Sequence, residues 1–187
     1  MPHALEEFRA QPNEWKTTML KTPCTTPGYC CFACVCAPCV IYLQRDQIIG
    51  DGKYQCCLGI FPCCTMNCPK IPCLCCEAFC CPGLAASANR IFIMQKLQIQ
   101  PDPCDEYIIC CSNIMQIVAC CVRLCSDDPS LADCCTYAAD LMFCVTLSCM
   151  QAQVEYEVDN NEKTNGVWPS LEKELPDTKG DNKVNMA

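Results

Sequence analysis

Residues 104–122 read CDEYIICCSNIMQIVACCV, and this stretch decides the fold class. Its apolar residues recur at steps of three and four, which is the period of a helix with one apolar face. The acids Asp105 and Glu106 stand at the start of the stretch, where the positive end of a helix favours negative charge. We therefore predict a helix that begins near Cys104 or Asp105 and continues to Val122.

Two further helices are predicted on either side of this one. Residues 83–98 have a helical composition with apolar residues at the same spacing, and two prolines in residues 100–103 separate them from the next helix. After Asp127-Asp128-Pro129, Ser130 is expected to cap a third helix from Leu131 to about Val158. The predicted fold class is mainly α, with about three helices after an irregular, metal-stapled Cys/Pro-rich region.

The rest of the chain suggests its domain organisation. Prolines are too frequent between Cys24 and Pro82 for long regular elements, and only one helix is expected there, roughly Val40 to Ile49. Trp15 is the one residue before this region that is suited to docking on a core. The predicted parts are a polar N-terminal segment (1–23), a cysteine-rich domain (24–158, divided into the Cys/Pro region 24–82 and the helical region 83–158) and a disordered acidic tail (159–187).

Cysteine is the residue that sets this chain apart, with 26 among 187 residues, all between Cys24 and Cys149. Three Cys-x-x-Cys steps start at Cys31, Cys36 and Cys73, and this spacing can bring two sulfurs onto one tetrahedral zinc ion. The only histidine, His3, lies outside the cluster, so the predicted zinc sites are structural and ligated by cysteine alone. The candidate ligands are Cys30, Cys31, Cys34, Cys36, Cys39, Cys56, Cys57, Cys63, Cys64, Cys68, Cys73, Cys75, Cys76, Cys80, Cys81 and Cys104. Iron–sulfur ligation, lipidation and simple apolar packing are the alternatives.

A second group of cysteines lies among the apolar residues of the predicted helices. Its members occur as adjacent pairs, which are natural targets of acylation, and they are also suited to packing as small apolar residues. The sequence leaves lipidation and packing open for Cys110, Cys111, Cys120, Cys121, Cys134 and Cys135.

Charge and histidine content exclude several classes of function. The formal charge is −8 and no segment is basic, so no nucleic-acid partner is expected. With no histidine near the cysteines, we expect no histidine-assisted catalysis and no enzyme. The first residues lack a basic n-region and an apolar h-region, so we expect an intracellular protein, cytoplasmic or membrane-associated, and not a secreted one. Tyr107–Val122 is the best candidate for a membrane span, but its 16 uncharged residues fall short of the roughly 20 that a full span requires.

The segment Cys36-Ala37-Pro38-Cys39 resembles the Cys-x-Pro-Cys signature of the placenta-specific, plant cadmium-resistance and cell-number-regulator family. The resemblance extends to the second half of that family's sequence pattern. The residues that carry it there are Arg90, Ile99, Cys104-Asp105-Glu106-Tyr107, Cys110-Cys111, Gln116 and Arg123. The resemblance covers roughly residues 28–124; the stretch Cys56–Cys81 looks expanded, and the helix from Leu131 to Val158 has no counterpart. It implies membrane association and links to heavy-metal resistance, growth control and ion flux, without a defining enzymatic activity.

These observations predict a non-enzymatic protein with structural zinc–thiolate sites. We expect it to act as a scaffold for protein partners or within a larger assembly, with membrane contact left open. The alternatives are sequestration or transport of zinc or cadmium at a membrane, and a thiol redox function.

Overall fold

The computed structural model describes residues 9–49 and 70–165, with side chains described up to residue 161. This part of the chain is almost entirely helical, which confirms the mainly α fold class. Its helices are α2 (Thr22–Thr25), α3 (Pro27–Val35), α4 (Ala37–Ile49), α5 (Lys70–Cys80), α6 (Pro82–Leu97), α7 (Pro103–Cys125) and α8 (Pro129–Asn165). An isolated parallel bridge between Asn13 and Ile99 is the extent of β pairing in these residues.

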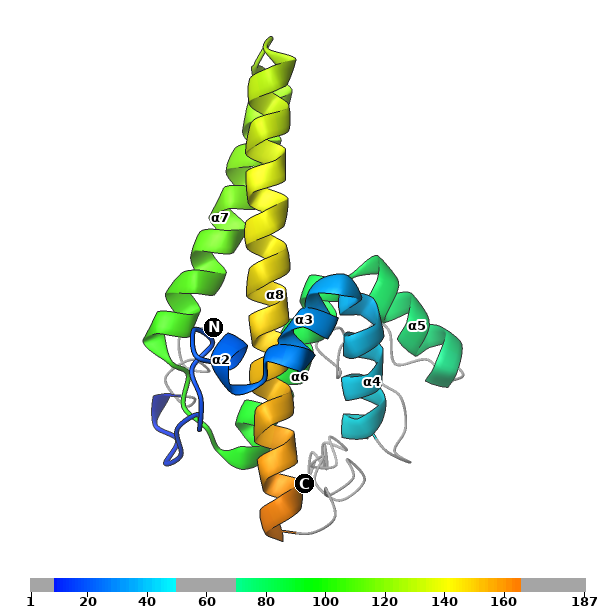
Figure 1. The fold of residues 1–187 in the computed structure, drawn as a ribbon, viewed down its shortest axis with the longest axis vertical. Helices are drawn as coiled ribbons and strands as arrows, with labels where there is room; N and C mark the ends of the chain where they lie inside the picture. Colours follow the sequence, from blue (N-terminus) through cyan, green and yellow to red (C-terminus); the bar gives the residue numbers. More distant parts are fainter. Residues whose placement is uncertain (1–8, 50–69, 166–187) are drawn as a thin grey trace, which may run out of the picture.

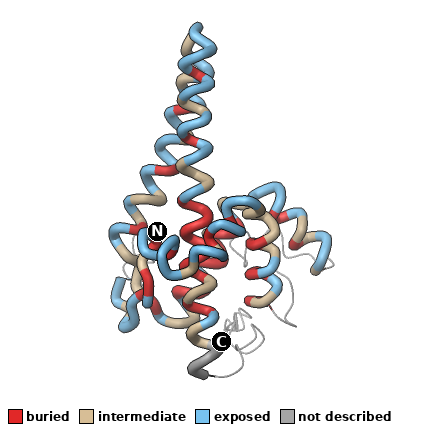
Figure 2. The backbone as a smooth tube through the Cα atoms, viewed as in Figure 1, coloured by how far each residue is buried: buried red, intermediate tan, exposed pale blue. Residues whose placement is uncertain are grey.

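The molecule consists of a helical body and a long projecting hairpin (Figure 1). Helices α7 and α8 rise side by side above the body and meet at a short turn. The other half of α8 continues downward through the body, where α2, α3, α4 and α6 lie around it, and α5 lies beyond α4. Figure 2 shows that buried residues gather on the middle and lower part of α8, while most of the projecting part is exposed.

Prolines divide the Cys/Pro region into short helices. Pro27 and Pro82 are the first residues of α3 and α6, and Pro38 is the second residue of α4. Proline is tolerated in a first helical turn because the N–H that it lacks would be unpaired there in any case. The expectation of one helix in this region was therefore too low. The chain bends by 116° between α3 and α4 and by 112° between α5 and α6.

Aspartates that precede prolines cap the two long helices. Asp102 accepts a hydrogen bond from the backbone N–H of Cys104 at 2.8 Å, and Asp128 accepts one from that of Ser130 at 2.9 Å. The prediction that Ser130 caps the last helix was wrong by two residues. That helix also continues past Val158 to Asn165, so the first part of the expected acidic tail is helical; the remainder of the tail lies outside the described residues.

The apolar core of the described residues forms three clusters, and α8 contributes to each. One joins Trp15, which is only 9% exposed, to Ile93 and Val154. This burial confirms the predicted docking of Trp15. The second joins Met19, Cys30, Cys149, Met150 and Ala152, and the third joins Ile41, Ala78, Ala85, Ala86 and Leu147.

Candidate functional site

Helices α7 and α8 are both long and apolar enough to cross a membrane. The 23 residues of α7 extend about 34 Å at about 1.5 Å per residue, and a hydrocarbon core is about 30 Å thick. Only 11% of the apolar window of α7 and 22% of that of α8 is buried inside the protein. The uncharged run was expected to be too short for a span, and this is corrected because α7 extends beyond it in both directions.

We define the hairpin arms as residues 107–125 of α7 and 129–149 of α8. The contact between the arms is made of small side chains. Ser112 and Ala119 are buried on α7, and Ala132 and Ala139 are buried on α8, with a spacing of seven residues in each pair. Such a repeat keeps one face of each helix against its neighbour. Small residues at the contact allow the close backbone approach that is typical of helices packed in membranes.

Large apolar side chains on the arms point away from this contact. Tyr107 is 74% exposed and Leu124 is 80% exposed. Ile114, Ile117, Val118, Leu131, Tyr137, Leu141 and Val145 are exposed as well. A helix pair that is stable in water would bury such residues between its helices. Away from the body the arms have the opposite arrangement, with small residues buried and large apolar residues exposed, whereas Leu147 near the base of the arms packs into the body.

Charges on the hairpin are concentrated at its tip. The tip carries Arg123, Asp127, Asp128 and Asp133, whereas residues 107–122 of α7 carry no charge. Between Asp133 and Glu155, the sequence of α8 has one charged residue, Asp140. The arms are therefore apolar over most of their length and end in a charged tip.

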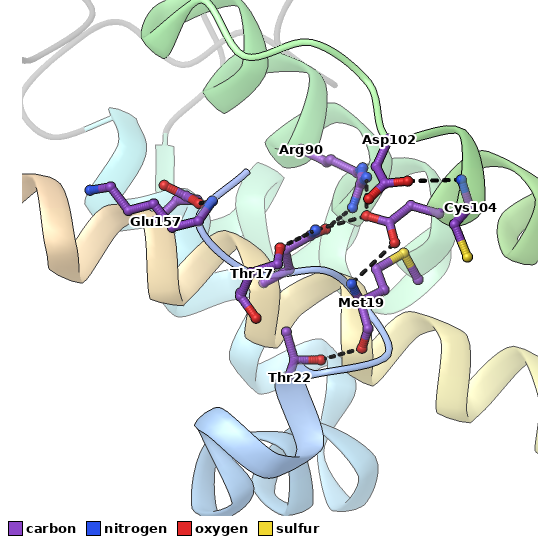
Figure 3. Close-up of polar contacts among 10 residues, drawn as sticks. Thr17, Met19, Thr22, Arg90, Asp102, Cys104 and Glu157 are labelled. Atoms are coloured by element: carbon purple, nitrogen blue, oxygen red, sulfur yellow. Dashed lines mark hydrogen bonds and ion pairs between the residues drawn. The ribbon is translucent and has the colours of Figure 1, made fainter. Parts of the chain in front are cut away.

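A buried polar network fixes the base of the hairpin to the body (Figure 3). Asp105 forms an ion pair with Arg90 of α6 at 3.0 Å. It also accepts hydrogen bonds from the backbone N–H of Met19 at 3.1 Å and from Nε2 of Gln153 at 2.7 Å. Gln153 Nε2 also donates to the carbonyl of Thr17 at 2.8 Å, and Arg90 Nη1 donates to Gln153 Oε1. One fully buried carboxylate thus joins the N-terminal segment, α6, α7 and α8.

One further contact and burial shape the environment of Arg90. Its guanidinium lies 4.6 Å from the centre of the Trp15 ring, an attractive cation–π arrangement. Burial lowers the pKa of the Arg90 guanidinium, and the carboxylate of Asp105 opposes that shift. Because arginine starts from a very high pKa, it keeps its charge, and the pair with Asp105 is a buried salt bridge.

A second buried ion pair holds the other helices of the body together. Arg45 of α4 contacts Glu77 of α5 and Asn89 of α6, each at 3.0 Å. Gln44 Nε2 donates to the carbonyl of Gln151 on α8 at 2.7 Å. These contacts join α4, α5 and α6 to one another and connect α4 to the lower half of α8.

The two bends of the body lie on the side from which the hairpin rises (Figure 1), and apolar residues next to both bends are exposed. Phe32 and Val35 are exposed just before the α3–α4 bend. Phe79 and Leu84 are exposed on either side of the α5–α6 bend. Apolar residues are therefore exposed beside both bends as well as on the hairpin arms.

The predicted zinc ligands are only partly brought together. Cys36 and Cys39 form a disulfide with their Cα atoms 5.4 Å apart, and the sulfurs of Cys76 and Cys80 lie 3.8 Å apart. Within residues 9–49 and 70–165, no three metal-ligating side chains converge. Exposed thiols in the predicted set are those of Cys31, Cys34, Cys76, Cys80, Cys81 and Cys104, whereas Cys73 and Cys75 are half-buried and Cys30 is buried. Because Cys56, Cys57, Cys63, Cys64 and Cys68 lie outside the described residues, the zinc sites stay a prediction.

The second group of cysteines lies on the hairpin arms. Cys110, Cys111, Cys120, Cys121 and Cys134 are exposed and Cys135 is half-buried. None of the six is buried inside the protein, so a packing role would require lipid or another chain as the neighbour. Lipidation and packing both stay predictions for these residues.

The network around Asp105 was not predicted from the sequence. Asp105 and Glu106 were expected to form a charged helix start, whereas the structure buries Asp105 and leaves Glu106 half-exposed. A usable signal was Arg90, the only charged residue between Glu77 and Lys96, in an otherwise apolar helix. An isolated charge on a helix that packs in the core requires a buried partner.

No protein-family model, curated protein or solved structure matches this chain. The family resemblance noted in the sequence therefore stays an expectation. Arg90 and Asp105, which form the buried ion pair, are among the residues that carry it.

Proposed function

We propose that this is a non-enzymatic membrane protein, with an α7–α8 hairpin that crosses the bilayer and a cysteine-rich body that acts as a scaffold for protein partners. One observation carries the proposal: the hairpin arms bury small residues against each other and expose large apolar ones. Lipid is the solvent in which that arrangement is stable. Each Ile, Leu or Val at the centre of a span favours insertion by about 0.3–0.6 kcal/mol.

The distribution of basic residues supports a cytoplasmic body. The tip of the hairpin carries one basic residue, Arg123, among three aspartates. The body carries more basic residues, among them Lys16, Lys21, Arg90 and Lys96. Basic residues are more frequent on the cytoplasmic side of membrane proteins, so the tip would be the translocated part. The bends near Val35 and Leu84 would then rest at the cytoplasmic surface of the bilayer.

The zinc–thiolate sites belong to the body in this proposal. A reducing cytosol favours thiolates over stable disulfides, and zinc would contribute folding free energy to the Cys/Pro region. Cysteine ligands alone would give closed, structural sites. The proposed activity is therefore binding and positioning of partners rather than catalysis.

Membrane translocation of the tip tests the proposal. The full chain is expressed with a long flexible insert between Ser126 and Asp127 that contains an Asn-x-Ser glycosylation acceptor. We expect glycosylation of this acceptor and resistance of the protein to alkaline extraction from the membrane. The matched control places the same insert between Pro101 and Asp102, in the body, where no glycosylation is expected. Release by alkaline extraction, with neither insert modified, would contradict the proposal.

A thiol redox function is the second candidate, and the Cys36–Cys39 disulfide favours it. The pair lies at the first turn of α4, where the helix dipole would stabilise a thiolate. Thiol counting on the full chain in glutathione buffers of graded potential tests it. A reversible two-electron step that is lost in Cys39→Ser and kept in Cys24→Ser would support the redox function. The absence of such a step would exclude it.

A further inference from the structure

The hairpin arms carry one charged side chain away from their ends, and it lies at half their height. Gln116 is ten residues from Ser126 at the tip, and Asp140 is eleven residues from Pro129. At about 1.5 Å per residue, both residues lie about 15–17 Å below the tip. A bilayer core is about 30 Å thick, so the proposed hairpin brings both residues to its middle.

Within the hairpin, these two side chains satisfy each other only in part. Gln116 Nε2 donates to Asp140 Oδ1 across the two arms at 3.4 Å, which is long for such a bond. Among the described residues, this is the one hydrogen bond that either side chain makes. Asp140 is exposed and Gln116 is half-exposed, so a group outside the hairpin can reach them.

An aspartate in this position opposes membrane insertion. At the centre of a span it costs about 2.5–3.5 kcal/mol, unless other polar groups or water satisfy it. Lipid tails offer no hydrogen bonds. The arrangement that makes the arms suitable for lipid therefore leaves Asp140 and Gln116 in need of a polar partner.

The pair is complementary to itself. The Gln116 amide donates hydrogen bonds and the Asp140 carboxyl group accepts them. Two hairpins related by a twofold axis could therefore bond Asp140 of each copy to Gln116 of the other. Exposed polar groups continue the same edge of the hairpin, with Asn113 one turn below Gln116 and Tyr137 one turn above Asp140 towards the tip.

We propose that two copies of this chain associate within the membrane through this edge, with Asp140 and Gln116 at the centre of the contact. This inference rests on the proposed membrane hairpin and names its partner. A second copy supplies equal numbers of donors and acceptors at the same depth. No third group and no counter-charge is required.

Energy transfer between copies of the full chain tests the inference. Proteins with donor or acceptor fluorescent domains fused to the N-terminus are reconstituted together in phosphatidylcholine vesicles. We expect transfer for the wild type that is lost on dilution with lipid. Asp140→Leu and Gln116→Leu should weaken association roughly tenfold, since interhelical hydrogen bonds in membranes contribute modestly and each dimer would lose two equivalent contacts.

Two variants decide whether hydrogen bonding at this depth is responsible for the association of two copies. Asp140→Asn keeps a donor and an acceptor and should associate like the wild type. Asp133→Leu removes a charge from the same face of α8, seven residues nearer the tip, and should leave association unchanged. A monomeric wild type, or an Asp140→Leu variant that associates normally, would overturn the inference. Loss of association in Asp140→Asn would also overturn it, because a charged or basic partner would then be required.

Alkaline extraction of the same vesicles separates this inference from the proposed function. A protein that stays in the membrane but does not associate contradicts only the pairing of two copies. A protein that is released from the membrane contradicts the hairpin itself.

Discussion

At the scale of single residues, Asp105 and Glu106 show why neighbours in sequence take different roles. Successive residues of a helix point about 100° apart, so one of two adjacent acids can face the body while the other faces solvent. Asp105 is fully buried against Arg90, whereas Glu106 lies 3.7 Å from Arg9 at the surface. The sequence predicted a charged helix start correctly. It could not assign the buried acid, because that depends on where α6 and the N-terminal segment pack.

Replacing Asp105 should therefore cost far more stability than replacing its neighbour. Asp105→Asn removes the charge that compensates Arg90, and breaking a buried pair in this way costs about 3–5 kcal/mol. Glu106→Gln breaks a surface pair and should cost about 0–1 kcal/mol. The check is the free energy of unfolding of both variants in the same detergent micelles. Equal losses in the two variants would show that the ion pair at the base of the hairpin does not stabilise the fold.

Single apolar residues on the arms should control membrane insertion. Ile117 is 62% exposed in the middle of α7, so Ile117→Arg would place an uncompensated charge in the bilayer. We expect insertion to become less favourable by about 3 kcal/mol. The measurement is the membrane-integrated fraction after translation with microsomes. Leu20→Arg is the control, because Leu20 is equally exposed but lies in the body, and insertion should not change there.

At the scale of elements, the positions of the long helices could be predicted from the sequence, but their full length and packing could not. Apolar periodicity located α6, α7 and α8, because most of their length follows one helical pattern. Between Cys24 and Pro82, α4 was predicted as roughly Val40 to Ile49, whereas α3 and α5 were missed because their prolines were read as breaks rather than as first-turn residues. The length of α7 was underestimated because its uncharged run was measured instead of the helix, which extends from Pro103 to Cys125 and is long enough to cross a membrane. The spacing of Ser112, Ala119, Ala132 and Ala139 was visible in the sequence and indicates close packing.

The small residues between the arms should not tolerate enlargement. Ala139 is completely buried where α7 and α8 meet, so Ala139→Leu would force the arms apart. Overpacking of this kind costs about 1–3 kcal/mol. Val145→Leu adds a methylene group on the exposed side of the same helix and should be neutral. Thermal unfolding of both variants in micelles distinguishes them, and a neutral Ala139→Leu would contradict close packing of the arms.

At the scale of the whole molecule, α8 connects two environments. Its outer half carries the exposed apolar surface of the arms, and its inner half contributes to all three core clusters of the body. The described members of the predicted zinc ligands lie outside the arms, whereas the arms are held by helix packing. The two halves should therefore depend on metal to different degrees.

Zinc removal should consequently loosen the body and leave the hairpin in place. On the full chain purified under reducing conditions, we expect at least one zinc ion per chain by elemental analysis. Structural zinc supplies folding free energy, so chelation should increase protease cleavage between Cys24 and Pro82. Resistance to alkaline extraction should not change, because small residues rather than metal hold the contact between the arms. A content of less than one zinc ion per chain would exclude the zinc sites and would leave the proposed hairpin standing. Release of the protein from the membrane on chelation would show instead that the hairpin depends on the metal-stabilised body.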